Sequence, residues 1–396
     1  MTSDKTLPPT KRLFDEYPTC LSFHATVLSC EQKKNAWEVV LDHTAFFPEG
    51  GGQGADHGTL GNTKVLDVHD RNGVIVHTID NPLSVGETVQ GEVDAERRLS
   101  NSQQHTGEHI LSGIIHSLYG YNNVGFHIGS DVVTVDVGGV LTEDDLRRVE
   151  RLANECVWRD VPVKAWFPTV EELKDITYRS KKEIDGGLRI VQIDGADTCA
   201  CCGTHVASTG MVGQIKIIGA IHYKGGMRLS ILCGMRALAY ENALLDENRA
   251  VSHALSAKQG ELAEAVLHLQ KERDGLREEL TKFAMEGLKR EVEAQREQLV
   301  RVAVVSGLEG AGLPRAASLL AEGAQFGLAL LPVESGWQFA LCAESGAPGA
   351  SKALCELFEA FGGCGGGGNG MAQGRLERGE PGMMRDLLDN LVRSGL

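Results

Sequence analysis

The chain has 396 residues, a formal net charge of −15 and 42% hydrophobic residues. This length exceeds one ordinary hydrophobic core, so several domains are expected. Non-specific nucleic-acid binding depends on phosphate neutralisation, and the acidic balance therefore argues against a generic DNA-binding protein. No apolar run reaches the roughly 18 residues of a membrane span, and the first residues lack a secretory signal. We expect a cytoplasmic protein with neither membrane nor DNA among its partners.

The N-terminal part, 1–93, is predicted to be a β-rich, barrel-like domain. Short runs such as "WEVVLD", "KVLDVHD", "GVIVHTID" and "TVQGEVD" indicate strands, and Asn72-Gly73 predicts a hairpin turn. The stretch "FFPEGGGQGADHGTLG" between the first two of these runs predicts a loop, because its glycines cannot pack a strand interior.

The next part, 94–236, is predicted to be α+β. Apolar residues at helical spacing indicate a helix from about Arg97 to Tyr119 that stops at Gly120. "VVTVDVG" indicates a strand, and "TEDDLRRVERLANECVWRD" indicates an amphipathic helix opened by a Thr-x-x-Asp cap. Further strands are expected in "LRIVQI", "GQIKIIGAIHY" and "MRLSILCG". Together with the preceding part, this predicts the α+β fold class.

The segment 237–300 contains no proline and predicts a long helix or a helical hairpin. An a/d rhythm, broken by Arg273, gives it a coiled-coil-like seam of Leu262, Val266, Leu269, Leu276, Leu280 and Phe283. The seam fits packing against the same chain as well as a homodimer. Gly275 and Gly287 argue against one straight rod.

The last part, 301–396, is predicted to be a small α/β domain. It ends with a glycine-rich loop, "GGCGGGGNGMAQGRL", followed by a helix. Backbone N–H groups of such a loop can cradle phosphates, but its spacing matches no Walker motif.

Two separated motifs predict a metal site. On a helix, His105 and His109 lie on one face, and His116 falls near that face. Some ninety residues later, Cys201 and His205 stand in a C-x-x-x-H spacing on a predicted loop. Three imidazoles and a thiolate form a tetrahedral donor set suited to Zn²⁺.

Other interpretations of these stretches stay open. Cys199 and Cys202 form a C-x-x-C, which can be a redox pair but leaves the histidines unexplained. His105 to His109 also reads H-x-x-E-H, the signature of a zinc peptidase with Glu108 as general base. That reading needs a glutamate ligand, for which Glu171 or Glu172 is the candidate. A local basic face is a further hypothesis, built from Arg179, Lys181, Lys182, Lys216, Lys224 and Arg228.

Several stretches, taken together, resemble one family. "DHTAFFPEGGGQGADHGTL", "HTGEHILS", "GFHIG", "CCGTHV" and "GMRLSILCGMRAL" follow the order found in the editing region of alanyl-tRNA synthetases. The chain looks like the freestanding alanyl-tRNA editing proteins, the AlaX group, in their long form. The paired histidine and cysteine motifs also occur in threonyl-tRNA synthetase editing domains, and the P-E-G-G-G-Q loop favours the alanine system. "GGGGNGMAQG" is similar to the end of the DHH-associated C-terminal domain.

The resemblance implies roles for particular residues. The zinc ligands carry over onto His105, His109, Cys201 and His205, although Cys202 stands where the family usually has glycine. Thr44 and Gln53 are the candidates for catalytic groups. The candidates for substrate binding are Gly50, Gly51, Gly52, Thr44 and His127.

The implied reaction is deacylation of tRNA(Ala) that carries serine or glycine, without any charging activity. Thr44 matches a family threonine associated with recognising the serine hydroxyl. The editing domain is 94–236, and binding of the rest of the tRNA is expected to fall to the helical segment and the C-terminal domain, 301–396. Weak binding with a strong salt dependence is expected. A non-catalytic tRNA-binding protein with a structural zinc is a further alternative.

Overall fold

The N-terminal strands form a closed barrel in the structure, which is a computed structural model describing residues 7–180, 188–308, 310–344 and 349–394. The barrel order is β2-β3-β7-β6-β5-β8, so each strand pairs with two neighbours. Asn72 and Gly73 both have positive φ, 55° and 88°, as the predicted hairpin turn requires. The strands are β2 (Ser22–Lys33), β3 (Ala36–Leu41), β5 (Gly58–Leu60), β6 (Thr63–Arg71), β7 (Val74–Ile79) and β8 (Thr88–Val93).

A separate two-stranded sheet and a short helix accompany the barrel. β1 (Lys11–Arg12) runs parallel to β4 (His43–Thr44), and α1 (Leu13–Glu16) follows β1. Phe14 of α1 meets Phe47 edge-on, with ring centroids 5.6 Å apart. This packing fixes the start of the connection between β4 and β5, which carries the glycine loop.

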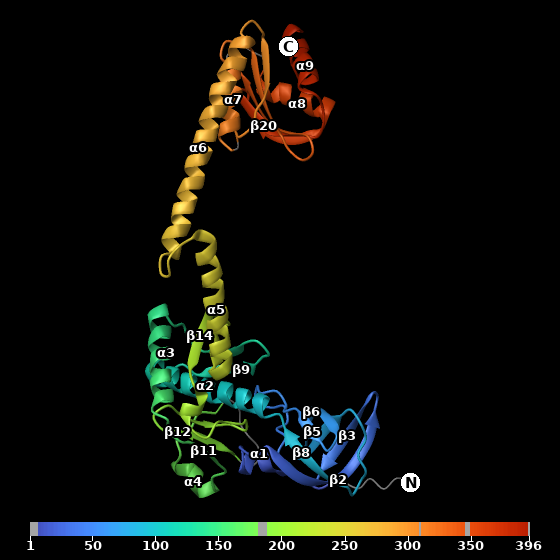
Figure 1. Ribbon diagram of the computed structural model, residues 1–396, viewed down its shortest axis with the longest axis vertical. Coiled ribbons are helices and arrows are strands. Elements are labelled where there is room, and N and C mark those ends of the chain that lie inside the picture. The colour runs from blue at the N-terminus through green and yellow to red at the C-terminus, as the bar shows by residue number, and fades with distance from the viewer. Residues whose placement is uncertain (1–6, 181–187, 309, 345–348, 395–396) are drawn as a thin grey trace. The chain divides into compact units, whose positions relative to one another are not determined.

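Helix α2 (Ala95–Tyr119) is the central element of the second part (Figure 1). Asp94 caps it by accepting a hydrogen bond from the Arg97 N–H, and Gly120, at φ 71°, ends it. Its middle is buried on every side, because a four-stranded sheet, a three-stranded sheet and α3 (Glu143–Trp158) surround it. The predicted boundaries of both helices, including the Thr142 cap of α3, agree with the structure to within two residues.

The two sheets are antiparallel and have the orders β14-β15-β10-β9 and β11-β12-β13. The remaining elements of this part are the helix α4 (Val170–Asp175), the 3-10 turn η1 (Thr209–Val212) and the strands β9 (Asn123–Ile128), β10 (Val133–Val137), β11 (Val163–Trp166), β12 (Ile190–Ile193), β13 (Asp197–Ala200), β14 (Ile215–Tyr223) and β15 (Gly226–Cys233). The expected mixed α+β class is confirmed.

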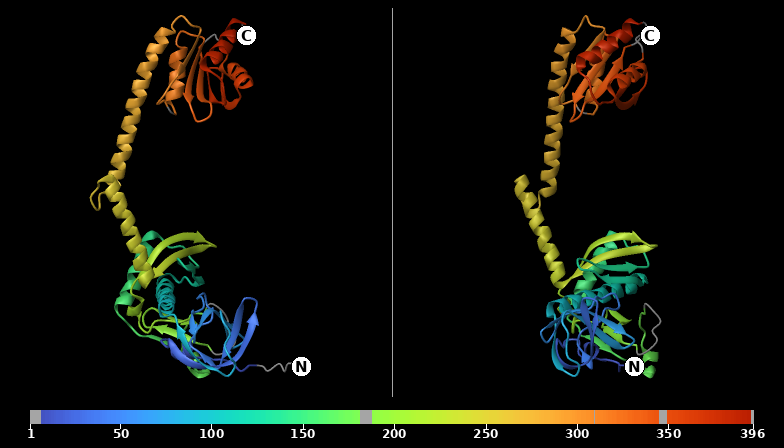
Figure 2. Two further views of the ribbon diagram at one scale, coloured as in Figure 1. Left: turned by 45° about the vertical axis from the view of Figure 1, so that its right-hand side comes forward. Right: turned by 90° about the vertical axis from the view of Figure 1, so that its right-hand side faces the viewer.

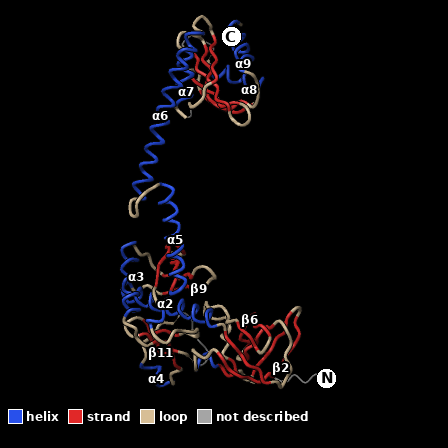
Figure 3. Tube along the Cα trace, in the orientation of Figure 1, coloured by secondary structure: helices blue, strands red, loops and turns tan. Residues whose placement is uncertain are grey.

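The helical segment consists of two helices, α5 (Gly234–Leu255) and α6 (Leu262–Ala294), with a loop between them (Figure 3). The chain breaks at Ser256 and Gly260, which have positive φ, rather than at Gly275 or Gly287, which lie within α6. Most of the predicted seam, from Val266 to Phe283, is exposed. Within the described residues no helix is long and apolar enough to cross a membrane.

The C-terminal part is a five-stranded sheet between two layers of helices (Figure 2). Alternate residues of its strands face α7 and the end of α6 on one side and α8 and α9 on the other. The elements are β16 (Val300–Val304), α7 (Gly312–Ala321), β17 (Phe326–Pro332), β18 (Trp337–Ala343), α8 (Ala350–Phe361), β19 (Gly363–Gly367), β20 (Met371–Leu376) and α9 (Pro381–Arg393).

The glycine-rich stretch of this part was expected to be a loop, and that expectation is wrong. Gly363–Gly367 forms β19, an edge strand that pairs with β20. A Cβ atom at Gly365 would lie 2.3 Å from the Gln373 carbonyl oxygen, so the two backbones approach closely only because β19 has no side chain there. The contact with the neighbouring strand outweighs the poor strand propensity of glycine.

The chain divides into two compact units, Met1–Asn248 and Arg249–Leu396. The finer division at residues 93, 236 and 300 stays a prediction.

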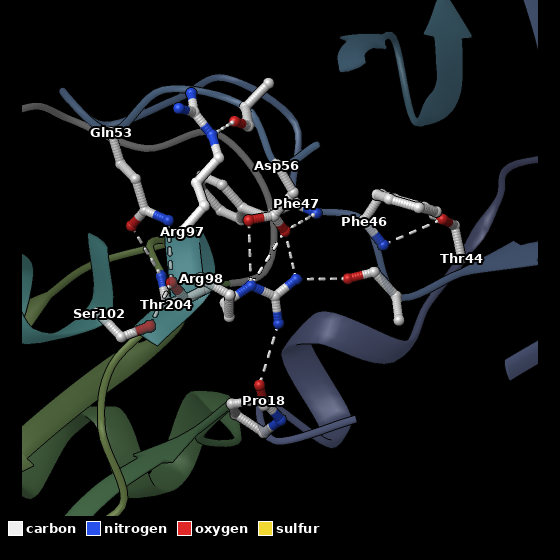
Figure 4. Close-up of polar contacts among 12 residues, drawn as sticks. Pro18, Thr44, Phe46, Phe47, Gln53, Asp56, Arg97, Arg98, Ser102 and Thr204 are labelled. Atoms are coloured by element: carbon white, nitrogen blue, oxygen red, sulfur yellow. Dashed lines mark hydrogen bonds and ion pairs between the residues drawn. The ribbon is translucent and has the colours of Figure 1, made fainter. Parts of the chain in front are cut away.

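A buried ion pair joins the barrel to α2 (Figure 4). Arg98 of α2 contacts both carboxylate oxygens of Asp56 and donates to the carbonyls of Pro18 and Ala45, at 3.0 and 2.6 Å. Asp56 also accepts from the Phe47 N–H at 2.7 Å. Every part of this pair is hydrogen-bonded, as a buried charge requires.

We expect Arg98→Ala to destabilise the N-terminal unit by roughly 3–5 kcal/mol, because it leaves the Asp56 charge buried and unpaired. Urea unfolding followed by circular dichroism measures the change. Arg71→Ala, which removes the exposed Arg71–Glu38 pair on the barrel, is the control and should cost about 1 kcal/mol or less. Equal effects of the two substitutions would contradict this prediction.

Candidate metal centre

Helix α2 presents His105 and His109 toward the same space. The two imidazoles stack with their centroids 5.4 Å apart, one helical turn from each other. Both side chains are almost fully buried. Burying two histidine side chains in the protein interior costs free energy unless their ring nitrogens form hydrogen bonds or bind a metal.

The loop after β13 brings Cys201 and His205 to this helix. Gly203 makes the approach possible, because a Cβ atom there would lie 2.1 Å from the His105 ring. The Val206 N–H donates to the Thr106 hydroxyl at 3.1 Å and so ties the loop to α2.

The structure brings the four predicted ligands together. The ligand atoms of His105, His109, Cys201 and His205 all lie within 4.8 Å of one another, and the Cys201 Sγ is 3.3 Å from the His105 Nε2. His116 is not in this group and lines a different pocket.

The donors of this cluster fit a bound cation. Within the described part of the chain, the Nε2 of His109 and both ring nitrogens of His205 are buried without a hydrogen-bond partner. Burial lowers the pKa of His205 to about 3, so its imidazole is neutral, the form that binds metals. Unpaired buried nitrogens of this kind are expected where a metal completes the site.

Charge within the cluster also favours a cation. Burial by itself would raise the pKa of the Cys201 thiol, but the neighbouring charges of His105 and His109 lower it well below its usual value. Burial would likewise lower the pKa of His109, but Cys201 and Asp197 raise it well above the usual value. A metal ion entering the site therefore displaces a proton.

Two side chains orient the histidines. The His105 Nδ1 donates to the Gln53 amide oxygen at 2.9 Å, and the His109 Nδ1 donates to the Asp197 carboxylate at 2.8 Å. Each bond leaves Nε2 to face the cluster. Arg179 holds Asp197 through two bonds of 2.8 Å. Burial would raise the pKa of Asp197, but the bonds from His109 and Arg179 lower it below its usual range.

The glycine loop lies beside the cluster. Gly50 and Gln53 exchange two backbone hydrogen bonds of 3.0 Å around Gly51 and Gly52, both at positive φ. Gly52 packs on β9, where a Cβ atom would lie 2.5 Å from the Phe126 carbonyl oxygen. A pocket of about 370 Å³ opens here, lined by the whole loop and by exposed His127. The predicted residues Gly50, Gly51, Gly52 and His127 thus share one pocket.

Gln53 connects this pocket to the metal cluster. Its backbone belongs to the loop, while its amide nitrogen donates to the Thr204 hydroxyl at 2.8 Å (Figure 4). Its amide oxygen accepts a hydrogen bond from His105. Thr204 in turn contacts Ser102 of α2 at 2.9 Å. The side chain is buried, and its described hydrogen bonds go to His105 and Thr204.

Thr44 lies in the barrel interior. Its side chain is fully buried, its oxygen accepts from the Phe46 N–H at 3.1 Å, and it lies 2.9 Å from the His77 Nε2. The His77 Nδ1 lies 3.2 Å from the Val39 carbonyl, so Nδ1 carries the proton and Nε2 accepts from Thr44. Thr44 is not among the residues that line the glycine-loop pocket.

The alternative interpretations rest on further residues, and those that the structure describes lie outside the cluster of four. Glu171 pairs with Lys174 and Glu172 caps α4, and neither belongs to the metal cluster. The basic face stays a prediction, although in the described part Arg179, Lys216 and Arg228 pair with carboxylates and Lys224 lies over Tyr223. Lys181 and Lys182 lie outside the described residues. Cys199 is buried on β13, and Cys202 is exposed.

Asp197 and Arg179 were missed as partners of the site. Carboxylates commonly orient histidine ligands, and Asp197 stands only four residues before Cys201. That proximity is the signal that the sequence offered. The ion pair with Arg179 depends on the fold and has no local pattern.

We expect Asp197→Asn to weaken divalent metal binding by roughly 10- to 100-fold, because His109 loses the carboxylate that fixes its ring. Chelator competition on the purified chain measures the affinity without reference to activity. Asp194→Asn, a neighbouring exposed carboxylate, is the control and should leave affinity unchanged. Unaltered affinity in Asp197→Asn would remove this residue from the site.

Comparison with known proteins identifies two matched regions. Residues 19–97 match the model of class II (A) tRNA synthetases, and residues 188–229 match the threonyl and alanyl tRNA synthetase second additional domain. The second region contains Cys201 and His205.

Whole-chain similarity leads to the same family. The alanyl-tRNA editing protein AlaX-L of Pyrococcus horikoshii is 28% identical over 382 residues, 93% of this chain and 95% of the relative. The alanyl-tRNA editing protein Aarsd1-A of Xenopus laevis is 34% identical over 262 residues, 63% of each chain. Alanine–tRNA ligase of Pyrococcus abyssi is 33% identical over 318 residues, 74% of this chain and 34% of the ligase. The chain spans about a third of the length of the ligases that it matches. It belongs to the family of alanyl-tRNA editing proteins.

Proposed function

We propose that the chain is a trans-editing hydrolase that cleaves the ester between serine and the 3′ end of tRNA(Ala), with glycine as a second substrate. Water attacks the ester carbonyl, and the products are the free amino acid and tRNA with a free terminal hydroxyl. One observation carries the proposal: a buried cluster of three histidines and a cysteine that Gln53 joins to a glycine-lined pocket. The named activity of its relatives supports the substrate class.

We assign the pocket beside the cluster to the terminal adenosine. Gly50, Gly51 and Gly52 expose backbone rather than side chains, so a nucleoside can approach the loop closely. His127 stands exposed on the opposite wall, where it can meet the ribose or a phosphate. The aminoacyl group would then point toward the cluster past Gln53.

We propose Zn²⁺ as the resident ion, held by His105, His109, Cys201 and His205, because a set of three nitrogens and one sulfur suits it. Zinc supplies Lewis acidity toward an ester carbonyl or a water molecule, or an anchor for the substrate amino group. Four protein ligands leave no open position. His205 is our candidate for the ligand that gives way. Unlike His105 and His109, it has no described hydrogen bond at either ring nitrogen to hold it in place.

Thr44 is proposed to select serine over alanine. His77 accepts the Thr44 proton, so the Thr44 oxygen can only accept from a further group. A serine hydroxyl can donate to this oxygen beside the bond from the Phe46 N–H, whereas alanine has no hydroxyl to donate. Sites built to bond a substrate hydroxyl reject the analogue without it by roughly 10⁴- to 10⁵-fold.

Two other functions are tested by simple variants. A zinc peptidase needs Glu108 as general base, but Glu108 is buried and accepts a hydrogen bond from Asn123. Glu108→Gln would abolish peptidase activity and leave a deacylase substantially active. A non-catalytic tRNA-binding protein would bind zinc and tRNA and leave Ser-tRNA(Ala) intact over hours.

The remaining expectations stay proposals. We propose that tRNA binding also involves the helical segment and the C-terminal part, that the exposed seam of α6 or the C-terminal part supports a homodimer, and that the protein acts in the cytoplasm. An acidic chain binds RNA through few phosphate contacts, so binding should be weak and sensitive to salt.

We expect Cys201→Ala to lose zinc and to slow deacylation of Ser-tRNA(Ala) by roughly 100-fold or more, since metal catalysis contributes several kcal/mol. Release of labelled amino acid from Ser-, Gly- and Ala-tRNA(Ala) measures the rates. Cys202→Ala is the matched control and should keep both zinc and activity. Equal wild-type rates on serine and alanine esters would refute the proofreading function.

We expect Thr44→Val to lower kcat/KM for Ser-tRNA(Ala) by roughly 10- to 100-fold, because one hydrogen bond to the substrate is lost. Activity on Gly-tRNA(Ala) should change little. Thr44→Ser restores the hydroxyl and should recover the rate, and Thr59→Val on β5 controls for packing of the barrel. An equal loss on both esters would mean that Thr44 acts only in folding.

A further inference from the structure

A second and larger pocket lies along the other half of α2. Its volume is about 980 Å³, and it is bounded by the end of α2, the end of α3, the turn between β12 and β13, and residues 177–179. None of the four metal ligands lines it. The role proposed above does not use this pocket.

One wall offers an unpaired cation and an exposed aromatic ring. Trp158, the last residue of α3, is 71% exposed. Arg159 follows it, and among the described residues no side chain forms an ion pair or hydrogen bond with its guanidinium. Solvent-exposed tryptophan beside an unpaired arginine is the combination that binds a base through its face and a phosphate through its charge.

The opposite wall offers polar and apolar surface. The Nδ1 of His116 is buried and has no hydrogen-bond partner within the described chain. Ile114 and Leu118, on the same stretch of α2, supply apolar surface. A base in the pocket would find apolar contact on this stretch of α2.

The acidic side chains of the pocket are already engaged. Glu155 pairs with Arg151, Asp194 lies 3.9 Å from Lys164, and Asp197 is held by Arg179. Among the described side chains that line the pocket, Arg159 is a cation without an ion-pair partner, so its charge is available to an incoming ligand. An anionic group is favoured at that end of the pocket.

We propose that this pocket binds a nucleotide, with its base against Trp158 and its phosphate at Arg159. The inference rests on the proposed function in one respect, that the nucleotide belongs to the bound tRNA, away from its aminoacylated end. A free mononucleotide has the same chemistry, and the test separates the two sources. The pocket would give the acidic chain a second point of attachment on RNA, independent of the metal.

The test compares Trp158→Ala and Arg159→Glu with two exposed controls outside the pocket, Phe167→Ala and Arg148→Glu. Fluorescence anisotropy of labelled, uncharged tRNA at fixed salt gives Kd. We expect each pocket variant to raise Kd about tenfold, the scale of one lost stacking contact, and each control to match wild type. Zinc content, unchanged in all four variants, shows that the fold is intact. In the deacylation assay, the two pocket variants should raise KM and leave kcat unchanged.

Titration with AMP and tryptophan fluorescence identifies the source. If AMP quenches the fluorescence of the wild-type protein but not that of Trp158→Ala, the pocket binds free nucleotides. If AMP causes no quenching while the pocket variants bind tRNA more weakly, the pocket binds an RNA strand. Wild-type Kd in both pocket variants, or an equal loss in Arg159→Glu and Arg148→Glu, would overturn the proposal. The binding assay uses uncharged tRNA and so does not depend on deacylation. If the pocket variants bind tRNA more weakly, as expected, but the wild-type protein does not deacylate Ser-tRNA(Ala), the proposed function is refuted and this inference stands.

Discussion

The Arg98–Asp56 ion pair is the constraint on which the site depends. It joins the connection between β4 and β5 to the first turns of α2, three residues after Gln53 and seven before His105. A buried pair of this kind contributes little net stability compared with apolar packing, because both charges lose their hydration. The pair instead fixes position, because the guanidinium and the carboxylate satisfy each other and nearby backbone groups. It holds the glycine loop against α2.

That position makes two motifs distant in sequence a single site. Gln53 reaches His105 across 52 residues and Thr204 across 151 residues. The loop after β13 therefore contacts both α2 and the glycine loop. Movement of any one of these three segments would disturb the direction in which the His105 Nε2 points, and a metal site tolerates little such movement. The glycine loop and the histidine–cysteine cluster are thus connected through the side-chain amide of Gln53.

The sequence supported strong expectations where local rules apply. Asn72-Gly73, the Thr142 cap and Gly120 mark turns and helix ends through backbone preferences that need no tertiary context. The clustering of His105, His109, Cys201 and His205 could also be predicted, because a helical i, i+4 spacing and a C-x-x-x-H motif are both short. Thr44's partner His77 and the partners of Asp197 could not, since they come from strand pairing and loop docking. Strand β19 could not be predicted, because a run of glycines has no alternation of polar and apolar side chains.

The neighbouring thiols Cys201 and Cys202 face different surroundings. Cys201 belongs to the cluster, whereas Cys202 is exposed and lies beside Gly51. Burial alone would raise the pKa of Cys201, but the charges of His105 and His109 lower it well below its usual value. Partial burial of its sulfur and the neighbouring charge of Cys201 raise the pKa of Cys202. Two adjacent cysteines therefore differ in acidity, and the residue with the lowered thiol pKa is the one that lies among the histidines.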